Sequence, residues 1–324
     1  MDRKCLGKSE GLTFWLAQPD DYEDVMSISE DIYAGSDYLP HRYHEWMEEP
    51  GRTVILARRE GKLVALESGL VVDEGATVVL EGLRVCSSER GRGVAGVIQR
   101  FADSYMQQQH PTIKMKRMTR GDDPGPEKLA KFTLLARRAI LPLCGEAESF
   151  DGFISLLKNK LQSPGVLSGL VPLDETQLKR VLLDHKLPSR VQLPGGAIIQ
   201  DWQPLRPMEG NLEILRRRNL TWLADSQEAP VFLSFYTPPY PIPYNRGSLR
   251  FNIDMFGTDP VLAQCALVGL IEAALAKGEL KGIVKVFVYM DQSLWETLQA
   301  FCEGHQGVMR GREHWEQLFL EREI

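Results

Sequence analysis

The sequence predicts a mixed α/β protein in which a central, mostly antiparallel sheet is flanked by helices. Three observations lead to this fold class. Hydrophobic periodicity and turn residues give the first half of the chain the order β-α-α-β-β-β-loop-α-β-α. The second half repeats a strand–helix–strand–helix–strand order. With 324 residues, the chain is long enough for two domains with cores of their own.

The first domain opens with a strand and two helices. Residues 13–17 form an apolar strand, and Pro19 opens a helix that runs through Ile32. The apolar residues of that helix recur at spacings of three or four: Tyr22, Val25, Ile28 and Ile32. The stretch SDYLP at residues 36–40 breaks the helix, and a short second helix covers residues 41–47.

Three strands joined by tight turns follow the second helix. Residues 53–59 and 62–72 meet at Glu60-Gly61, and a DEG turn leads into residues 77–85. Connections this short join antiparallel neighbours. The domain then alternates between helix and strand: a helix over residues 94–110, a strand over 113–119 and an amphipathic helix over 126–140.

A second domain is expected from residue 163 onward. Pro164-Gly165 marks the boundary between residues 1–162 and residues 163–324. The predicted strands of the second domain cover residues 197–200, 231–236, 249–255, 283–290 and 315–320. Its predicted helices cover residues 209–217, 261–276 and 292–301.

Composition and charge argue against several classes of protein. The formal net charge of -6 and the pI near 5.7 disfavour a nucleic-acid binder, which needs a basic face. No apolar run approaches the roughly 20 residues of a membrane span, and the start MDRKCLGKSE lacks the apolar centre of a signal peptide. The five cysteines are scattered without metal-ligand spacing, which predicts reduced thiols in a cytoplasmic protein without a metal site.

The segment SERGRGVAG, residues 88–96, is the strongest local motif. Its glycines fit GxGxxG, the dinucleotide fingerprint, whereas Arg90, Gly93 and Ala95 fit RxxGxA, a turn that binds the pyrophosphate of coenzyme A. A GxGxxG loop directly follows the first strand of a βαβ unit. Here polar residues separate Val85 from Gly91, and three antiparallel strands come first. The order of elements therefore favours RxxGxA.

Each residue type in this loop suits an anion at the start of a helix. A helix N-terminus offers free N–H groups and a partial positive charge. Gly91 and Gly93 lack Cβ atoms and Ala95 is small, so the backbone can close around phosphates. Arg90 and Arg92 add positive charge. The loop therefore predicts a pyrophosphate site.

Six segments carry a family resemblance: SDYLPHRYHEW, VALESGLVV, EGLRV, RGRGVAG, IIQDWQP and FNIDMFG. Together with the order of elements, they resemble the GNAT superfamily of acetyl-CoA-dependent N-acetyltransferases, and more closely still its histidine N-acetyltransferase family. The likeness runs over most of the chain. It implies two GNAT-like domains in tandem and transfer of acetyl from acetyl-CoA to the α-amine of free L-histidine.

The resemblance also implies where the co-substrate binds. The thioester would lie against the backbone of Leu83, Arg84 and Val85, where an N–H holds the thioester oxygen as charge develops on it. The pyrophosphate would lie on the amides of Arg90, Gly91, Arg92, Gly93, Val94 and Ala95. The side chains of Arg84 and Arg92 either assist or are merely solvated. Many superfamily members carry a Tyr that protonates the thiolate, on the helix after the fifth strand, but residues 126–140 contain none.

Glu81 is the predicted catalytic base. An ammonium cannot attack a thioester, so the acceptor amine must first lose a proton. Strand alternation places Glu81 on the same face as Val79, Leu83 and Val85, and a carboxylate among apolar side chains is a stronger base. The alternative is a structural carboxylate that accepts a hydrogen bond from a neighbouring backbone amide.

Three further residues are predicted to bind the acceptor. Glu67 and Ser68 interrupt the apolar strand next to the one that carries Glu81, and either bind the imidazole or the amine or mark a bulge. Tyr38 lies in the loop between the first two helices, which flanks the acceptor site in the superfamily. Its ring can stack and its hydroxyl can hydrogen-bond, or it anchors the loop.

The second domain is expected to have lost its co-substrate. The corresponding loop, FGTDPV, has one glycine and an acid where the phosphate would lie, which indicates a degenerate GNAT-like domain. Residues 238–244, rich in proline and tyrosine, either close over the acceptor site or form a surface loop stiffened by proline. Two other functions stay open: acetylation of protein N-termini or lysines, and coenzyme A binding without catalysis. No membrane partner is expected, and the oligomeric state is not predicted.

Overall fold

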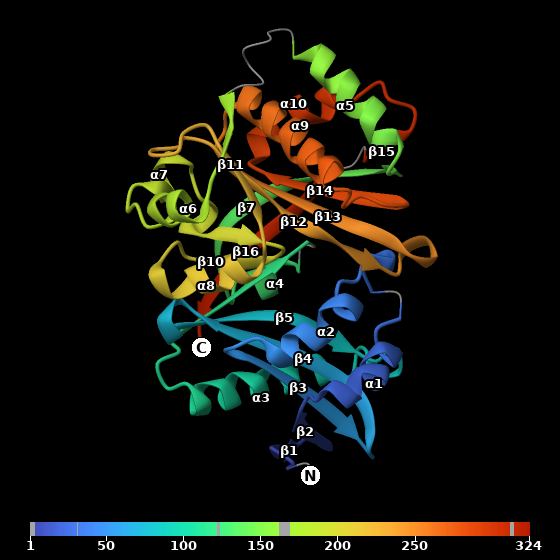
Figure 1. The fold of residues 1–324 in the computed structure, drawn as a ribbon. Helices are drawn as coiled ribbons and strands as arrows, with labels where there is room; N and C mark the ends of the chain where they lie inside the picture. The colour runs from blue at the N-terminus through green and yellow to red at the C-terminus, as the bar shows by residue number, and fades with distance from the viewer. Residues whose placement is uncertain (1–3, 31, 122–123, 162–168, 312–313) are drawn as a thin grey trace. The chain divides into compact units, whose positions relative to one another are not determined.

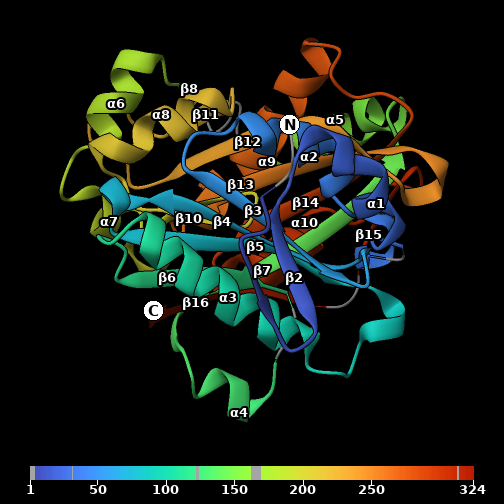
Figure 2. The same cartoon turned by 90° about the horizontal axis from the view of Figure 1, so that it is seen from below.

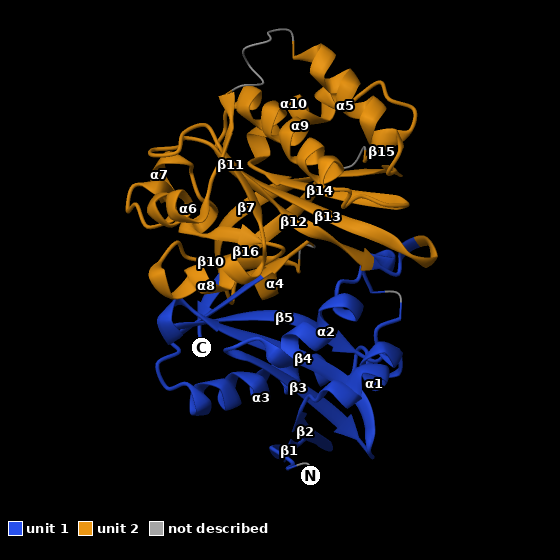
Figure 3. Cartoon of the chain, viewed as in Figure 1, with its two compact units in different colours: residues 1–118, 242–244, 321–324 blue, residues 119–241, 245–320 orange. Residues whose placement is uncertain are grey.

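The computed structural model describes residues 4–30, 32–121, 124–161, 169–311 and 314–324. The chain divides into two units, shown in blue and orange in Figure 3. Unit 1 consists of residues 1–118, 242–244 and 321–324, and unit 2 of residues 119–241 and 245–320. The predicted border between residues 162 and 163 lies outside the described residues. Residues 124–161, which precede it, belong to unit 2.

Unit 1 is built on a sheet whose strands follow the chain order (Figure 1). These strands are β1 (Gly7–Ser9), β2 (Leu12–Leu16), β3 (Arg52–Arg59), β4 (Lys62–Val72), β5 (Thr77–Val85) and β6 (Met115–Arg120). Its helices are α1 (Tyr22–Ser27), α2 (Leu39–Glu48) and α3 (Val94–Gln109). Neighbouring strands are antiparallel except β5 and β6, which are parallel.

The helices of unit 1 lie on both faces of this sheet (Figures 1 and 2). α3 buries its apolar side against the first strands, with Val97 and Ile98 in one cluster with Phe14. On the face of α2, a Cβ atom at Gly82 would lie 2.7 Å from the Trp46 ring, so a larger residue does not fit there. The sheet is thus enclosed between α3 and the pair α1 and α2.

Two irregularities lie in the strands that carry the predicted site. The register of β4 and β5 shifts between Leu66 and Ser68, so Glu67 lies at a β-bulge, as one interpretation of the sequence expected. The residue after Glu81 is Gly82, with a φ angle of 80°. Among the described residues, the parallel pairing of β5 with β6 covers Thr77 to Val79. The end of β5 lies beyond that pairing.

Unit 2 has a longer list of elements. Its strands are β7 (Thr133–Glu146), β8 (Val171–Pro172), β9 (Ile198–Gln200), β10 (Gln203–Leu205), β11 (Thr221–Ala224), β12 (Leu233–Ile242), β13 (Ser248–Phe256), β14 (Ile283–Met290), β15 (Val308–Arg310) and β16 (Trp315–Glu323). Its helices are α4 (Pro126–Leu129), α5 (Ser149–Lys160), α6 (Glu175–Leu182), α7 (Leu187–Arg190), α8 (Glu209–Arg217), α9 (Pro260–Ala276) and α10 (Trp295–Phe301).

The main sheet of unit 2 has the order β16-β7-β14-β13-β12-β11-β8, while β9 and β10 pair separately. β13 and β14 are parallel, and β14 runs antiparallel to β7. Three helices cover one face and share its core, with Phe150 from α5, Leu267 from α9 and Leu298 from α10. None of the described helices is long and apolar enough to cross a membrane.

The predicted helix over residues 126–140 is wrong. α4 ends at Leu129, and β7 begins at Thr133. From Ala139 to Glu146, β7 pairs with β14 in an unbroken antiparallel register. Ala139, Leu141 and Leu143 alternate into the core, a period of two that the periodicity of the isolated segment does not reveal. A partner strand distant in sequence decides the structure here, because strand preference depends on context.

Two other predicted elements end well away from their predicted last residues. The first helix ends at Ser27 rather than at Ile32, and Tyr33 and Ala34 adopt positive φ angles. The strand predicted over residues 231–236 begins at Leu233 and runs through the prolines to Ile242. Residues 238–242 are therefore strand rather than loop.

Candidate active site

The loop between β5 and α3 leaves backbone N–H groups open at the helix start. Gly91 and Gly93 adopt φ angles of 78° and 81°, which favour glycine. Gly93 is the N-cap of α3 and has no side chain to cap the helix. The Val97 N–H donates to the Gly93 carbonyl oxygen at 3.2 Å, and it is the first N–H with a helical acceptor. The N–H groups of Val94, Ala95 and Gly96 therefore precede the helical hydrogen bonds.

The same loop has room for an anion. A Cβ atom at Gly91 or at Gly93 would meet no heavy atom of the described chain within 4 Å. Side-chain packing within the chain therefore does not require these glycines; their positive φ angles favour glycine, and the open space leaves the backbone accessible to an anion. Arg90 donates from Nε to the Val85 carbonyl oxygen at 3.1 Å, which ties the loop to the end of β5. The Arg92 side chain is 68% exposed, and its Nη1 lies 3.8 Å from Glu89 Oε1.

The predicted thioester site at the end of β5 has one exposed and one buried side chain. Leu83 is 36% exposed. Arg84 is buried and pairs with Asp37, so its guanidinium is not a solvated charge. Asp37 Oδ1 also accepts the Leu39 N–H at 3.0 Å, at the start of α2. Arg84 thus holds the end of β5 against the loop that precedes α2.

The corresponding helix start in unit 2 is closed. Asp259 is the N-cap of α9, and its Oδ1 accepts the N–H groups of Val261 at 2.8 Å and Leu262 at 2.9 Å. A Cβ atom at Gly257 would lie 2.8 Å from the Phe232 ring and from the Val231 carbonyl oxygen. A carboxylate of the chain itself therefore occupies the position that a phosphate takes at an open helix start.

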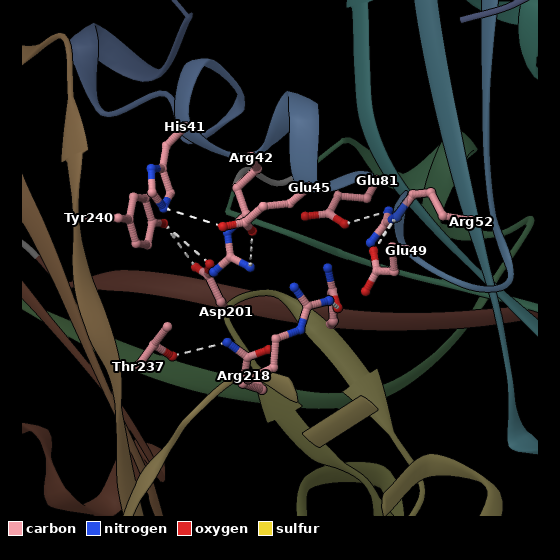
Figure 4. A network of polar contacts seen from close by, with 12 residues as sticks. His41, Arg42, Glu45, Glu49, Arg52, Glu81, Asp201, Arg218, Thr237 and Tyr240 are labelled. Atoms are coloured by element: carbon pink, nitrogen blue, oxygen red, sulfur yellow. Dashed lines mark hydrogen bonds and ion pairs between the residues drawn. The ribbon is translucent and has the colours of Figure 1, made fainter. Parts of the chain in front are cut away.

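Glu81 lies in an ion-paired cluster rather than among apolar side chains. Its Oε2 accepts a hydrogen bond from Arg52 Nη1 at 2.9 Å, and its side chain is 9% exposed. Arg52 Nη1 also donates to Ser68 Oγ at 2.8 Å, and Arg52 Nε donates to Glu49 Oε2 at 2.6 Å. Figure 4 shows Arg52 reaching toward Glu49 and Glu81. Ser68 and Glu81 are direct neighbours across β4 and β5.

Tyr38 joins the same part of unit 1. Its ring lies 6.0 Å from Trp46 and 6.2 Å from Tyr33, and the Arg84 guanidinium lies 5.6 Å from its centre. Burial raises the pKa of Tyr38 well above its ordinary value, and the Glu81 carboxylate raises it further. Tyr38 is therefore a neutral phenol, and its side chain is near Glu81.

Glu67 lies apart from these residues, on the face of the sheet that α3 covers. Its carboxyl interacts with Gln99 of α3 and with the pair formed by Lys116 and Asp103. Burial, helped by the Asp103 charge, raises the pKa of Glu67 to about 8. The structure thus brings Tyr38, Ser68 and Glu81 together and separates Glu67 from them.

Sequence reasoning missed three residues of the cluster: Trp46, Glu49 and Arg52. Trp46 lies within a segment that carries the family resemblance, but the ring position against β5 depends on how α2 packs. Arg52 opens a strand of apolar residues, where a charge at an edge usually faces solvent. Its burial follows from the pairing of β3 with β4, which a single sequence does not show.

Unit 2 has a buried polar cluster of its own, built from the segments IIQDWQP and FNIDMFG. Asp201 accepts a hydrogen bond from the Tyr240 hydroxyl at 3.2 Å (Figure 4). It also accepts one from Asn252 Nδ2 at 2.5 Å. Arg250 donates to Asn252 Oδ1 at 3.0 Å and to the Tyr289 hydroxyl at 2.8 Å. The two quoted segments therefore meet in one hydrogen-bonded group.

Comparison with known sequences places relatives along almost the whole chain. It is 38% identical to histidine N-acetyltransferase of Scomber australasicus, over 97% of this chain and 94% of that protein. It is 39% identical to the human protein named probable N-acetyltransferase 16, over 98% of this chain and 87% of that protein. A family model described as histidine N-acetyltransferase, C-terminal, matches residues 166–291.

Comparison with solved structures gives the fold. A tandem GNAT protein from the clavulanic acid biosynthesis pathway superposes with a TM-score of 0.56 at 15% identity, over 96% of this chain and 98% of that chain. A GCN5-related N-acetyltransferase from Sphaerobacter thermophilus gives a TM-score of 0.52 at 10% identity, over 98% and 97% of the two chains. The tandem GNAT architecture expected from the sequence is thus confirmed at the level of the fold.

Proposed function

Because the chain belongs to the histidine N-acetyltransferase family, we propose that it transfers the acetyl group of acetyl-CoA to the α-amine of free L-histidine. The products are N-acetyl-L-histidine and coenzyme A. One structural observation supports the proposal in addition to sequence similarity. The open helix start of α3 and the Glu81 carboxylate belong to the same unit, which thereby offers a phosphate site and a proton acceptor.

The residues at the start of α3 fit the pyrophosphate of acetyl-CoA. The N–H groups of Val94 and Ala95 precede the helical hydrogen bonds, and a Cβ atom at Gly91 or Gly93 would meet open space. The Arg92 N–H donates to the Glu89 carbonyl oxygen at 3.4 Å, and the side chains of Arg90 and Arg92 supply positive charge. We place the thioester against the backbone of Leu83, Arg84 and Val85, at the end of β5. When bound, acetyl-CoA supplies an acyl carbon attached to a thiol leaving group.

The acceptor amine loses its proton to Glu81 and then attacks the acyl carbon. The new N–C bond forms as the C–S bond breaks, and the electron pair of that bond leaves with the sulfur. The nitrogen then loses a second proton, which the coenzyme A thiolate takes up to give the thiol, and Glu81 releases its own proton to solvent. A thiol has a pKa of about 8.5, so the thiolate can leave without a general acid. This matters because residues 126–146 hold no tyrosine, and most of them form β7 rather than a helix.

Tyr38 and Ser68 are the proposed acceptor contacts. Tyr38 is a neutral phenol near Glu81 that is only 7% exposed, so we assign it a contact through its hydroxyl rather than a stacking surface, and Ser68 lies beside Glu81 on the neighbouring strand. Glu67 faces α3, so we assign it no contact with the acceptor.

Thiol release from acetyl-CoA tests the proposal, measured with each of the twenty amino acids, histidine amide and peptides that begin with histidine. We expect the highest kcat/KM with free histidine, with N-acetyl-L-histidine identified by mass spectrometry. A site that pairs the free carboxylate loses affinity when an amide replaces it. Preference for peptides would instead indicate a protein acetyltransferase, and coenzyme A binding without any thiol release would indicate a non-catalytic binder.

A further inference from the structure

We propose that Arg52 is a positioning residue that orients the Glu81 carboxylate for the acceptor amine and keeps a positive charge beside it. The inference rests on the proposed function, because it concerns the group that receives the proton of that amine. Arg52 does not touch the reacting atoms in this proposal, and it acts only through Glu81.

The Arg52 side chain is held from four directions within unit 1. It is 0% exposed, and its guanidinium carbon lies 4.5 Å from the centre of the Trp46 ring. Its Nε donates a hydrogen bond to Glu49, and its Nη1 donates to both Ser68 and Glu81. These contacts come from the end of α2, from β4 and from β5, so three elements fix the direction in which Nη1 points.

The hydrogen-bond pattern of Arg52 indicates a role in addition to stabilising the fold. Glu49 at 2.6 Å already neutralises the guanidinium. Arg52 nevertheless directs Nη1 to a second carboxylate and leaves Nη2 buried without a hydrogen-bond partner in the described structure. A buried donor without a partner is costly, and guanidinium groups usually satisfy more of their five donors. The geometry therefore favours contact with Glu81 over full satisfaction of Arg52.

The contact has a defined effect on proton transfer. A guanidinium beside a carboxylate favours its charged form, which is the form able to accept a proton. Among the described residues, Glu49 shares the Arg52 guanidinium with Glu81, Tyr38 near Glu81 is held neutral by burial, and the nearby Arg84 pairs with Asp37. Removal of Arg52 should therefore move the acidic limb of the pH–rate profile to higher pH.

The test compares two variants of Arg52 with a matched control on the same strand. Arg52→Met removes the charge but keeps an apolar side chain against Trp46. Arg52→Lys keeps a positive charge but lacks the several N–H donors of the planar guanidinium. Arg58 is the control, because it also lies on β3 and pairs with two carboxylates, Asp21 at 2.9 Å and Asp24 at 2.7 Å.

For Arg52→Met we expect the acidic limb of kcat/KM for histidine to move to higher pH, because a positive charge beside the carboxylate is lost. We also expect kcat to fall roughly tenfold or more as the carboxylate loses its orientation. Arg52→Lys should keep the limb near its wild-type position while kcat falls, which also gives a result if Arg52→Met does not fold. Arg58→Met should lower the melting temperature and leave the limb unmoved, and acetyl-CoA affinity should be unchanged throughout.

An acidic limb and a kcat per folded molecule that match wild type in both Arg52 variants would overturn the inference. Glu81→Gln separates this failure from that of the proposed function. If Glu81→Gln abolishes the limb while the Arg52 variants leave it unchanged, Glu81 is the base and Arg52 does not position it. If wild-type protein releases no thiol with histidine, the proposed function itself fails.

Discussion

Two glutamates on neighbouring strands show how local partners separate chemical roles. Glu81 lies against a guanidinium on one face of the sheet. Glu67 lies at a bulge on the other face, under α3, where burial raises its pKa to about 8. Ionised carboxylates accept protons, whereas a buried neutral carboxyl does so only at high pH. The first is therefore held in contact with a cation, and the second makes stability depend on pH.

Glu67→Gln should remove that pH dependence. The folded-state pKa of Glu67, about 8, lies above the value of about 4.3 in an unfolded chain. Between these values the folded protein binds a proton that the unfolded chain does not, so stability falls as pH rises through the folded pKa. Glutamine is neutral throughout. We expect similar melting temperatures for variant and wild type at pH 5 and a gain of roughly 5 °C or more for the variant at pH 9.

Glu23→Gln provides the control for this measurement, because Glu23 is exposed on α1. Its melting temperature should follow that of wild type across the same pH range. A constant difference between Glu67→Gln and wild type at all pH values would show that Glu67 is ionised in the folded protein, contrary to this prediction.

At the scale of elements, local patterns predict those structures that depend on neighbours in sequence. The hairpins of β3, β4 and β5 follow from tight turns between apolar runs, and α9 and β14 follow from long apolar segments. Local patterns do not predict β7, because its partner strand β14 lies more than a hundred residues away in sequence. The interior of α9 needs no pairing information, since a helix satisfies its own backbone.

The residues of the candidate site also fall into those that local sequence predicts and those that depend on long-range pairing. Gly91, Gly93 and Arg90 can be found from spacing, because a phosphate loop is local in sequence. Strand alternation predicts Glu81 and the resemblance predicts Tyr38, but the structure places Arg52 and Ser68 beside Glu81 rather than the apolar side chains that alternation suggested. Arg52 and the separation of Glu67 from Ser68 depend on strand register and on which helix covers which face. Such features arise from long-range pairing, which a single sequence does not contain.

Gly93→Val should abolish acetyl-CoA binding by placing a branched side chain in the open space at the start of α3. The control is Gly61→Val in the turn between β3 and β4. Gly61 has a φ angle of 79°, and a Cβ atom there would meet no heavy atom within 4 Å, so both variants carry similar backbone strain. Calorimetry should show loss of binding in Gly93→Val alone. Wild-type affinity in Gly93→Val would remove the loop from the co-substrate site.

At the scale of the whole molecule, the two units differ in their helix starts. Unit 1 has an open glycine loop before α3, whereas Asp259 closes the start of α9 in unit 2. We interpret unit 2 as a GNAT-like unit without a co-substrate site. Its contribution to the fold is visible in the buried core that α5, α9 and α10 form on the sheet.

Calorimetry of the full chain should therefore give one acetyl-CoA per chain. Asp259→Ala removes the carboxylate from the start of α9 and should lower stability by about 1 kcal/mol, the usual effect of losing an N-cap. The stoichiometry should remain one, because Phe232 and Val231 still crowd Gly257. Two sites of comparable affinity in wild type would contradict the interpretation of unit 2.

The central claim is that Glu81 accepts the proton of the acceptor amine, and the pH–rate profile of Glu81→Gln tests it most directly. Glutamine keeps the shape and hydrogen-bonding capacity of glutamate but cannot take up the proton. We expect the rate with histidine to fall by about 10²-fold or more, the acidic limb to disappear, and acetyl-CoA affinity to stay close to wild type. A folded variant that turns over histidine at the normal rate, with an unchanged acidic limb, would remove Glu81 from the mechanism.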